Sequence, residues 1–172
     1  MLSMLYPDIY IKSIYELPLD YLKERGIKVI AFDIDNTLTP FNIAEPDDKT
    51  VAFIERLKAM GFKVCLLSNN NKHRITVYNK RLNVYAIYKA GKPGAKKLLA
   101  LIKRLGCTAD ETALVGDQVF TDVLCAHNGR VLGILTKPIC KQDQFVTKIK
   151  RGAEKCVLKM YFKKEGIKYE DD

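Results

Sequence analysis

The sequence predicts an α/β fold in which a doubly wound, Rossmann-like parallel sheet of five strands carries helices on both faces. Three observations predict it: short runs rich in Val, Ile and Leu alternate with longer amphipathic stretches, the connections are short, and polar side chains follow the ends of the runs. Continuous apolar runs are typical of strands that are buried on both faces, as in parallel sheets. We therefore expect repeated β-α-β units.

The chain divides into five expected strands and five expected helices. The strands lie near residues 28–33, 63–67, 84–88, 112–116 and 130–135. The helices lie near 48–60, 72–81, 94–105 and 119–128, with a long one near 142–164. Asp47 suits the N-cap of the first helix, and Gly61 suits its end. Pro93 suits the first turn of the third helix, and Gly106 suits its end.

The length of 172 residues favours a single domain with a substantial core. We expect an N-terminal extension over 1–27 that packs on the core, a catalytic core over 28–135, and a basic C-terminal helix and tail over 136–172. The net charge of +9 indicates an anionic partner. Between Lys141 and Lys168, nine basic residues stand against three acidic ones, so most of the net charge lies in this segment.

Several classes of protein are disfavoured by the composition. The five cysteines form no C-x-x-C pair, which favours reduced thiols over a disulfide framework or a zinc site. No stretch reaches the roughly 18 apolar residues of a membrane span, and the N-terminus lacks the order of a signal peptide. We expect a cytoplasmic protein, with peripheral contact at the inner face of the membrane as the alternative.

Polar side chains follow four of the expected strands. Asp33 and Asp35 end the first strand, and Ser68-Asn69-Asn70 follow the second. Lys92 follows the third strand and Asp117 the fourth. Because ligands of parallel sheets bind beyond the carboxyl ends of the strands, these groups are expected to meet at one edge.

The acidic groups at this edge suit phosphoryl transfer. Asp33 is the expected nucleophile, which would form an aspartyl-phosphate. Asp35 is the expected acid and base, which would protonate the leaving oxygen and then activate water. Magnesium prefers oxygen ligands. The expected ligands of Mg²⁺ are the side chains of Asp33, Asp117 and Asp122 and the backbone carbonyl of Asp35. Asp122 also suits the cap of its own helix.

A second group of residues is expected to bind the phosphoryl oxygens. These are the Ser68 hydroxyl, the Lys92 ammonium, and the backbone amides around Asn36, Thr37 and Asn69. Preorganised donors and charges of this kind supply much of the rate enhancement in phosphoryl transfer. The neighbouring Asn70 is expected to be a structural or flap residue. Arg74 is expected to be a solvated helix residue, with contact to the substrate as the alternative.

The same residues resemble the motifs of the haloacid dehalogenase superfamily. The first motif of that superfamily is similar to Asp33-Ile34-Asp35-Asn36-Thr37-Leu38, and the second is similar to Leu67-Ser68-Asn69-Asn70. The third is similar to Lys92-Pro93, and the fourth is similar to the stretch from Gly116-Asp117 through Asp122. The asparagine run and Gly-Asp-Gln-x-x-Thr-Asp resemble the YqeG-type branch of subclass IIIA, which is related to a mitochondrial phosphatidylglycerophosphatase. The resemblance implies a magnesium-dependent phosphatase and does not select its substrate.

The spacing between the motifs bears on the substrate. Ser68 lies 35 positions after Asp33, and Lys92 lies 24 positions after Ser68. Neither gap holds a cap domain, so we expect an open, capless site that suits a large substrate. A partner subunit of a homo-oligomer is the alternative lid. A lipid phosphate such as phosphatidylglycerophosphate is the first substrate hypothesis; nucleotides, sugar phosphates and phosphoproteins are alternatives.

The basic C-terminal segment leaves a further alternative open. One helical face is expected to carry Phe145, Ile149, Ala153, Cys156 and Met160, beside a basic face. Such a helix either packs its apolar stripe on the sheet or lies on an anionic membrane. A weakly active module that binds RNA or ribosomes is the non-enzymatic alternative, but nucleic acid is not the favoured partner.

Overall fold

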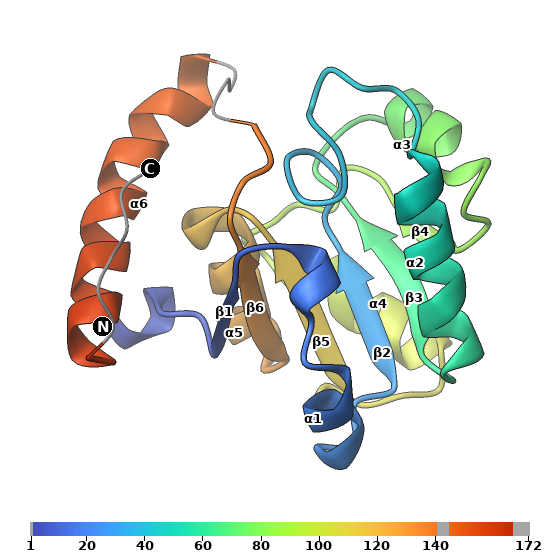
Figure 1. Ribbon diagram of the computed structural model, residues 1–172, viewed down its shortest axis with the longest axis horizontal. Helices are drawn as coiled ribbons and strands as arrows, with labels where there is room; N and C mark the ends of the chain where they lie inside the picture. The colour runs from blue at the N-terminus through green and yellow to red at the C-terminus, as the bar shows by residue number, and fades with distance from the viewer. Residues whose placement is uncertain (1, 141–144, 167–172) are drawn as a thin grey trace.

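The computed structural model describes residues 2–140 and 145–166, and its centre is a six-stranded parallel sheet (Figure 1). The strands are β1 (Ile9–Ile11), β2 (Val29–Phe32), β3 (Lys63–Leu67), β4 (Tyr85–Ile87), β5 (Thr112–Gly116) and β6 (Leu132–Thr136). Their order in the sheet is β1-β6-β5-β2-β3-β4, and every neighbouring pair is parallel. The predicted α/β class with a parallel sheet is confirmed.

The prediction of five strands is wrong by one. The additional strand, β1, lies in the N-terminal extension and pairs with the edge of β6, with Ile9 opposite Ile134. Its three residues are too few to show a period that distinguishes a strand from a loop. The extension also holds two short 3-10 helices, η1 (Leu2–Leu5) and η2 (Ile14–Glu16), and helix α1 (Leu19–Glu24).

Helices cover both faces of the sheet, as predicted. They are α2 (Asp48–Ala59), α3 (Lys72–Asn79), α4 (Lys96–Arg104), the π-helix η3 (Val119–Val123), α5 (Leu124–Gly129) and α6 (Phe145–Lys164). Alternate residues of β2 serve opposite faces: Phe32 packs in a core with side chains of α1, α2 and α3, whereas Ala31 packs with α4 and α5. Burial of each large apolar side chain contributes about 1.5–3 kcal/mol.

The helix ends test the predicted caps. Asp47 caps α2, since its Oδ1 accepts a hydrogen bond of 2.7 Å from the Thr50 N–H. The prediction that Pro93 lies in the first turn of α4 is wrong, because α4 begins at Lys96. Pro93 instead lies in a turn that the Gly94 N–H closes on the Gly91 carbonyl at 2.8 Å. This turn presents Lys92 to the carboxyl edge of the sheet.

Helix α6 lies beside the β1 edge, next to the N-terminal segment (Figure 1). The predicted start near residue 142 lies outside the described residues, as do the side chains of Phe145 and Ile149. The alternative in which this face packs on the sheet is otherwise wrong, because Ala153, Cys156 and Met160 are exposed. Tyr161 packs against Tyr6, and Phe162 packs against Tyr10, so the face of α6 that carries Tyr161 and Phe162 is the buried one.

No helix within residues 2–140 and 145–166 is long and apolar enough to cross a membrane. Within residues 29–116, all of which are described, the chain carries no inserted cap domain: only the segment 33–47 separates β2 from α2. No domain inserted between β2 and β5 therefore covers the carboxyl edge of the sheet.

Candidate functional site

Three buried carboxylates and one buried ammonium meet at the carboxyl edge of the sheet. Asp33 follows β2, Asp117 follows β5, and Asp122 lies in η3; one carboxylate oxygen from each lies within 4.8 Å of the other two. Lys92 joins two of them, since its Nζ donates to Asp33 Oδ1 at 2.7 Å and to Asp122 Oδ1 at 2.6 Å. The four side chains come from three segments of the chain, because Asp117 and Asp122 lie five positions apart after β5.

Strand pairing and one glycine bring these groups together. β2 and β5 are neighbours in parallel register, and the Asp33 N–H donates to the Val115 carbonyl at 2.9 Å. Asp33 and Asp117 therefore emerge side by side. Gly116, the residue between Val115 and Asp117, must lack a side chain, because a Cβ there would lie 2.2 Å from Asp122 Cγ. The carboxylate of Asp122 occupies the space that any other residue at 116 would fill.

Burial and charge oppose each other in this cluster. The pKa of Asp33 is raised to about 7: burial raises it most, Lys92 lowers it, and the carboxylates of Asp122 and Asp35 raise it. Burial lowers the pKa of Lys92, but the attraction of Asp122 and Asp33 outweighs burial and keeps this pKa above its usual value. When Asp33, Asp117 and Asp122 are ionised, one ammonium leaves two negative charges in excess. A divalent cation is the natural complement.

Asp35 lies apart from this carboxylate cluster. Its Oδ1 accepts from Arg74 Nε at 3.1 Å and Nη2 at 2.9 Å, and its Oδ2 accepts from Asn70 Nδ2 at 3.1 Å. Arg74 Nη1 also donates to the Ala44 carbonyl at 2.7 Å. The guanidinium therefore ties Asp35 to the loop that precedes α2.

Arg74 and Asn70 are residues whose contacts the sequence interpretation missed. The expectation that Arg74 is solvated is wrong, because its side chain is only 12% exposed. No local feature of the sequence pointed to this contact. In the structure Asn71 caps α3 by accepting from the Arg74 N–H at 2.9 Å, so Arg74 lies in the first turn of that helix. From this turn the guanidinium reaches Asp35, which lies just beyond the end of β2.

The residues expected to bind phosphate lie around the same edge. Ser68 is buried, and its Oγ accepts from the Asn70 N–H at 3.2 Å. The Asn69 side chain holds the backbone of Lys92: its Oδ1 accepts from the Lys92 N–H at 2.8 Å, and its Nδ2 donates to the Lys92 carbonyl at 3.0 Å. Asn69 thereby fixes where the Lys92 ammonium emerges.

The turn after Asp35 uses its own backbone amides. Asn36 has a left-handed φ of 63°, and its N–H donates to the Thr39 carbonyl at 2.7 Å. The Thr37 N–H donates to the Ile34 carbonyl at 3.2 Å. The Thr37 hydroxyl donates to Asp117 Oδ1 at 3.3 Å, so this turn contacts the carboxylate cluster directly. Phosphate binding by the amides around Asn36 and Thr37 stays a prediction.

A Rossmann-like parallel sheet with buried aspartates and a lysine at its carboxyl edge defines a hydrolase of the haloacid dehalogenase class. The family model described as haloacid dehalogenase-like hydrolase matches residues 41–129, and this chain belongs to that family. The resemblance seen in the motifs is thus confirmed for the family.

Two relatives extend the comparison beyond the matched range. The chain is 32% identical over 165 residues to the probable phosphatase YqeG of Bacillus subtilis, with 96% of each chain covered. It is 28% identical to the phosphatidylglycerophosphate phosphatase 1 of Arabidopsis thaliana, a chloroplastic and mitochondrial protein. That match covers 94% of this chain but 49% of the plant protein, so the chain spans about half of the plant relative.

Solved structures share the fold. The cobalt-bound deoxy-D-mannose-octulosonate 8-phosphate phosphatase of Haemophilus influenzae superposes with a TM-score of 0.55 at 19% identity, over 81% of this chain and 91% of that one. A Moraxella catarrhalis 3-deoxy-D-manno-octulosonate 8-phosphate phosphatase, in complex with magnesium, phosphate and KDO, gives 0.50 at 18% identity over 84% and 92% of the two chains. At these identities the likeness establishes the architecture.

Proposed function

We propose that the protein is a magnesium-dependent phosphatase that hydrolyses a phosphate monoester through an aspartyl-phosphate on Asp33. Its family and its phosphatase-named relatives support a phosphatase of this type. The observation that carries the proposal is the Lys92 ammonium, held between Asp33 and Asp122 beside Asp117. We further propose that residues 1–172 act as one catalytic domain, in which the N-terminal segment completes the sheet.

The carboxylate cluster fits Mg²⁺. Asp33, Asp117 and Asp122 offer hard oxygen ligands, and their excess negative charge matches a dication. The backbone carbonyl of Asp35 is the further ligand expected. Mg²⁺ bound there would supply positive charge that neutralises the carboxylates and the phosphoryl oxygens. Asp122, bonded to Lys92 and to the Gln118 N–H at 3.1 Å, would place the ammonium as well as bind the ion.

The residues divide the reaction between them. The carboxylate of Asp33 attacks phosphorus, and the bond between phosphorus and the ester oxygen breaks while Asp35 donates a proton to that oxygen. Asp35 then takes a proton from water, whose oxygen attacks the aspartyl-phosphate and releases phosphate and the Asp33 carboxylate. Lys92 and the hydroxyl of Ser68 bind the phosphoryl oxygens, where their charge and dipole stabilise the transition state.

We propose a phosphatidylglycerophosphate-like lipid as the substrate. The name of the Arabidopsis relative supports this choice, and so does the uncapped edge of the sheet. Peripheral contact with an anionic membrane would bring such a lipid to the site. On α6, the exposed Ala153, Cys156 and Met160 lie beside the exposed Lys155 and Lys159, a combination that suits an interfacial helix. Residence in the cytoplasm, at the inner face of the membrane, remains part of this proposal.

The test is hydrolysis of a panel of phosphate esters, including lipid phosphates in vesicles, with and without Mg²⁺. We expect turnover that requires Mg²⁺ and that the Asp33→Asn variant lacks. Asp110→Asn is the matched control, because Asp110 is an exposed residue that precedes β5, at the opposite edge of the sheet. Equal release of phosphate by wild type and Asp33→Asn would contradict the proposal, as would the absence of turnover on every ester.

A further inference from the structure

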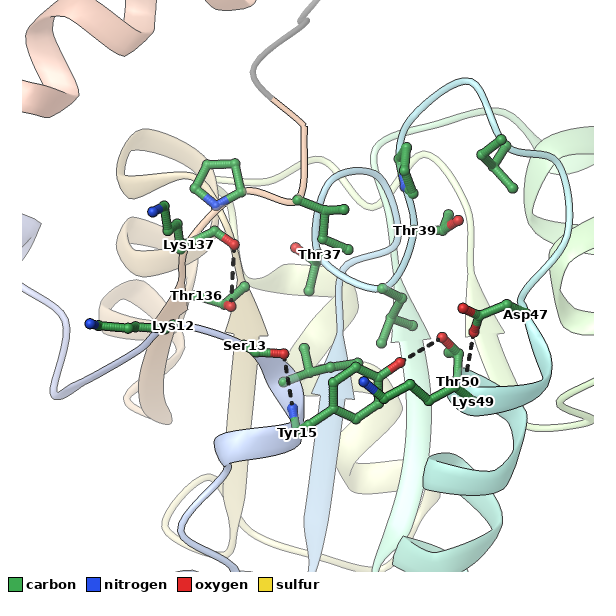
Figure 2. Close-up of a pocket in the computed structure, with 16 residues that line it drawn as sticks. Lys12, Ser13, Tyr15, Thr37, Thr39, Asp47, Lys49, Thr50, Thr136 and Lys137 are labelled. Carbon is green, nitrogen blue, oxygen red and sulfur yellow. Dashed lines mark hydrogen bonds between the residues drawn. The ribbon is translucent and has the colours of Figure 1, made fainter. Parts of the chain in front are cut away.

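Asp122 differs from the other two carboxylates of the cluster in how the chain holds it. Asp33 comes directly after β2 and Asp117 directly after β5, so strand pairing fixes both. Figure 2 shows Thr37 in the turn that follows β2, and its hydroxyl supports Asp117 further by donating to Oδ1 at 3.3 Å. Asp122 instead lies inside the short π-helix η3. Its position therefore depends on what holds η3.

The cap of η3 comes from another helix. The first amides of a helix have no partner within it, and the side chain at the N-cap usually accepts from one of them. Gln118, at the N-cap of η3, does not do so, and its Oε1 accepts from the Thr121 hydroxyl at 3.2 Å. The Phe120 N–H, second in η3, donates to Glu154 Oε1 at 3.3 Å. Glu154, on α6, thus performs the task of an N-cap residue from 34 positions away.

Glu154 is a buried carboxylate on an apolar face of α6. Its exposed fraction is 4%, and it shares this face with the buried Val157 and Tyr161. Val157 packs with Val119 and Val123 of η3. Burial of a carboxylate costs free energy, and an apolar side chain of similar volume would attach α6 at least as stably. The packing of α6 alone therefore does not account for a carboxylate at this position.

The π-helix connects this cap to the carboxylate cluster. Asp122 lies two positions after Phe120, and its N–H donates to the Gln118 carbonyl at 2.8 Å. Asp122 Oδ2 accepts from the Gln118 N–H at 3.1 Å, and Oδ1 accepts from Lys92 Nζ at 2.6 Å. A displacement at the start of η3 therefore moves Asp122 against Lys92. Groups that orient a metal ligand from outside the coordination sphere typically change metal affinity by about 10- to 100-fold.

We propose that Glu154 is a positioning residue of the reaction centre: by capping η3 it fixes Asp122 where that carboxylate can bind Mg²⁺ and hold the Lys92 ammonium. This inference rests on the proposed phosphatase function and assigns α6 a part in the metal site. Glu154 acts on the ion through Asp122.

The test is the Kd for Mg²⁺, measured by calorimetry on Glu154→Leu and Glu154→Gln. Leucine fills similar space in the apolar face but offers no acceptor to the Phe120 N–H, so we expect a Kd about 10-fold higher or more. Glutamine keeps an acceptor oxygen and should recover most of the affinity. An unchanged Kd in Glu154→Leu, or an equal loss in Glu154→Gln, would overturn the proposal.

Two controls separate the cap from a general loss of stability. Glu165→Leu replaces an exposed glutamate just beyond α6. Ile54→Val removes one methylene from a buried residue of α2, which lowers stability away from η3. Both should keep the wild-type Kd for Mg²⁺, and urea unfolding without Mg²⁺ gives the stability of every variant. If Ile54→Val weakens Mg²⁺ binding as much as Glu154→Leu, lost stability explains both results and the proposal fails.

Mg²⁺ binding requires no ester, so the result is separable from the phosphatase proposal. A Kd that depends on Glu154, in a protein that hydrolyses no ester, supports the cap and contradicts the phosphatase. Turnover that requires Mg²⁺, with the same Kd in wild type and Glu154→Leu, does the reverse. Wild-type protein that binds no Mg²⁺ overturns both proposals. With p-nitrophenyl phosphate, Glu154→Leu should need about 10-fold more Mg²⁺ for its half-maximal rate, whereas an unchanged requirement would contradict the cap.

Discussion

Arg74 donates two hydrogen bonds to one oxygen of Asp35 and a third to the carbonyl of Ala44. A single guanidinium thus orients the proposed acid and base and fixes the loop before α2. The contact is partly buried, with 12% of the Arg74 side chain and 22% of the Asp35 side chain exposed. Arg74 is a positioning residue in this arrangement, because it acts on the reacting atoms through Asp35.

Replacement of Arg74 tests this role. Arg74→Ala is expected to lower kcat by about 10- to 100-fold, because a displacement of about 1 Å in a catalytic group has an effect of this size. Arg74→Lys keeps the charge without the planar fork and should retain an intermediate kcat. Steady-state kinetics and the Tm of each variant provide the measurement. Arg56→Ala, on the exposed side of α2, is the control. An unchanged kcat in Arg74→Ala would exclude the positioning role.

Gly116 offers a test of the carboxylate cluster that removes none of its charged groups. In Gly116→Ala, the new Cβ would lie 2.2 Å from Asp122 Cγ, so Asp122 must leave its contact with Lys92. We expect activity to fall at least 10-fold, and the free energy of unfolding to fall by about 1–3 kcal/mol, the usual effect of overpacking.

The matched control for Gly116→Ala is Gly152→Ala, a glycine inside α6 whose added Cβ would meet no atom within 4 Å. This change should raise stability by about 0.5–1 kcal/mol through helix propensity and leave activity unaltered. Urea unfolding and phosphate release distinguish the two variants. A Gly116→Ala protein with full activity would show that Asp122 need not occupy its present position.

The positions of the acidic groups could be predicted because they depend on local order. Apolar runs predict parallel strands, and parallel strands place Asp33, Ser68 and Asp117 at one edge whatever the loops do. The pairing of β1 with β6 could not be predicted, because it joins segments about 125 residues apart and involves three residues. The face that α6 buries is likewise set by Tyr6 and Tyr10, at the other end of the chain.

The contact between Arg74 and Asp35 could not be predicted from the sequence either, because it also joins residues that lie far apart in the chain. The two residues are 39 positions apart, and their meeting depends on how α3 leaves the end of β3. An arginine in an exposed-looking helical pattern has no local feature that distinguishes a buried partner from solvent. The roles of Asp33, Asp35 and the other site residues stay predictions until variants are measured.

Magnesium binding is expected to stabilise the folded protein. At a free Mg²⁺ concentration of about 100 times its Kd, a ligand that binds only the native state adds about 2.7 kcal/mol to the free energy of unfolding. Asp117→Asn should remove most of this effect, since it deletes one carboxylate of the cluster. Asp110→Asn should retain it. Thermal unfolding with Mg²⁺ and with EDTA gives the comparison, and an identical Mg²⁺ shift in Asp117→Asn would place the ion elsewhere.

The N-cap of α2 predicts a dependence of stability on pH. Hydrogen bonds from Thr50 hold the pKa of Asp47 below its usual value, and the charges of Lys49 and Arg81 lower it further. Because the pKa is lower in the folded state, Asp47 stabilises the fold above its unfolded pKa of about 3.9. That contribution is lost as the pH falls through the folded pKa. Asp47→Ala should therefore lower stability by about 1 kcal/mol at neutral pH.

The difference between wild type and Asp47→Ala should shrink as the pH falls below about 4, because protonation weakens the cap in the wild type alone. Urea unfolding at several pH values measures it. Asp110→Ala is the control, since Asp110 is exposed and lies outside the helices. A difference that stays constant from neutral to acidic pH would show that the Asp47 carboxylate acts without its charge.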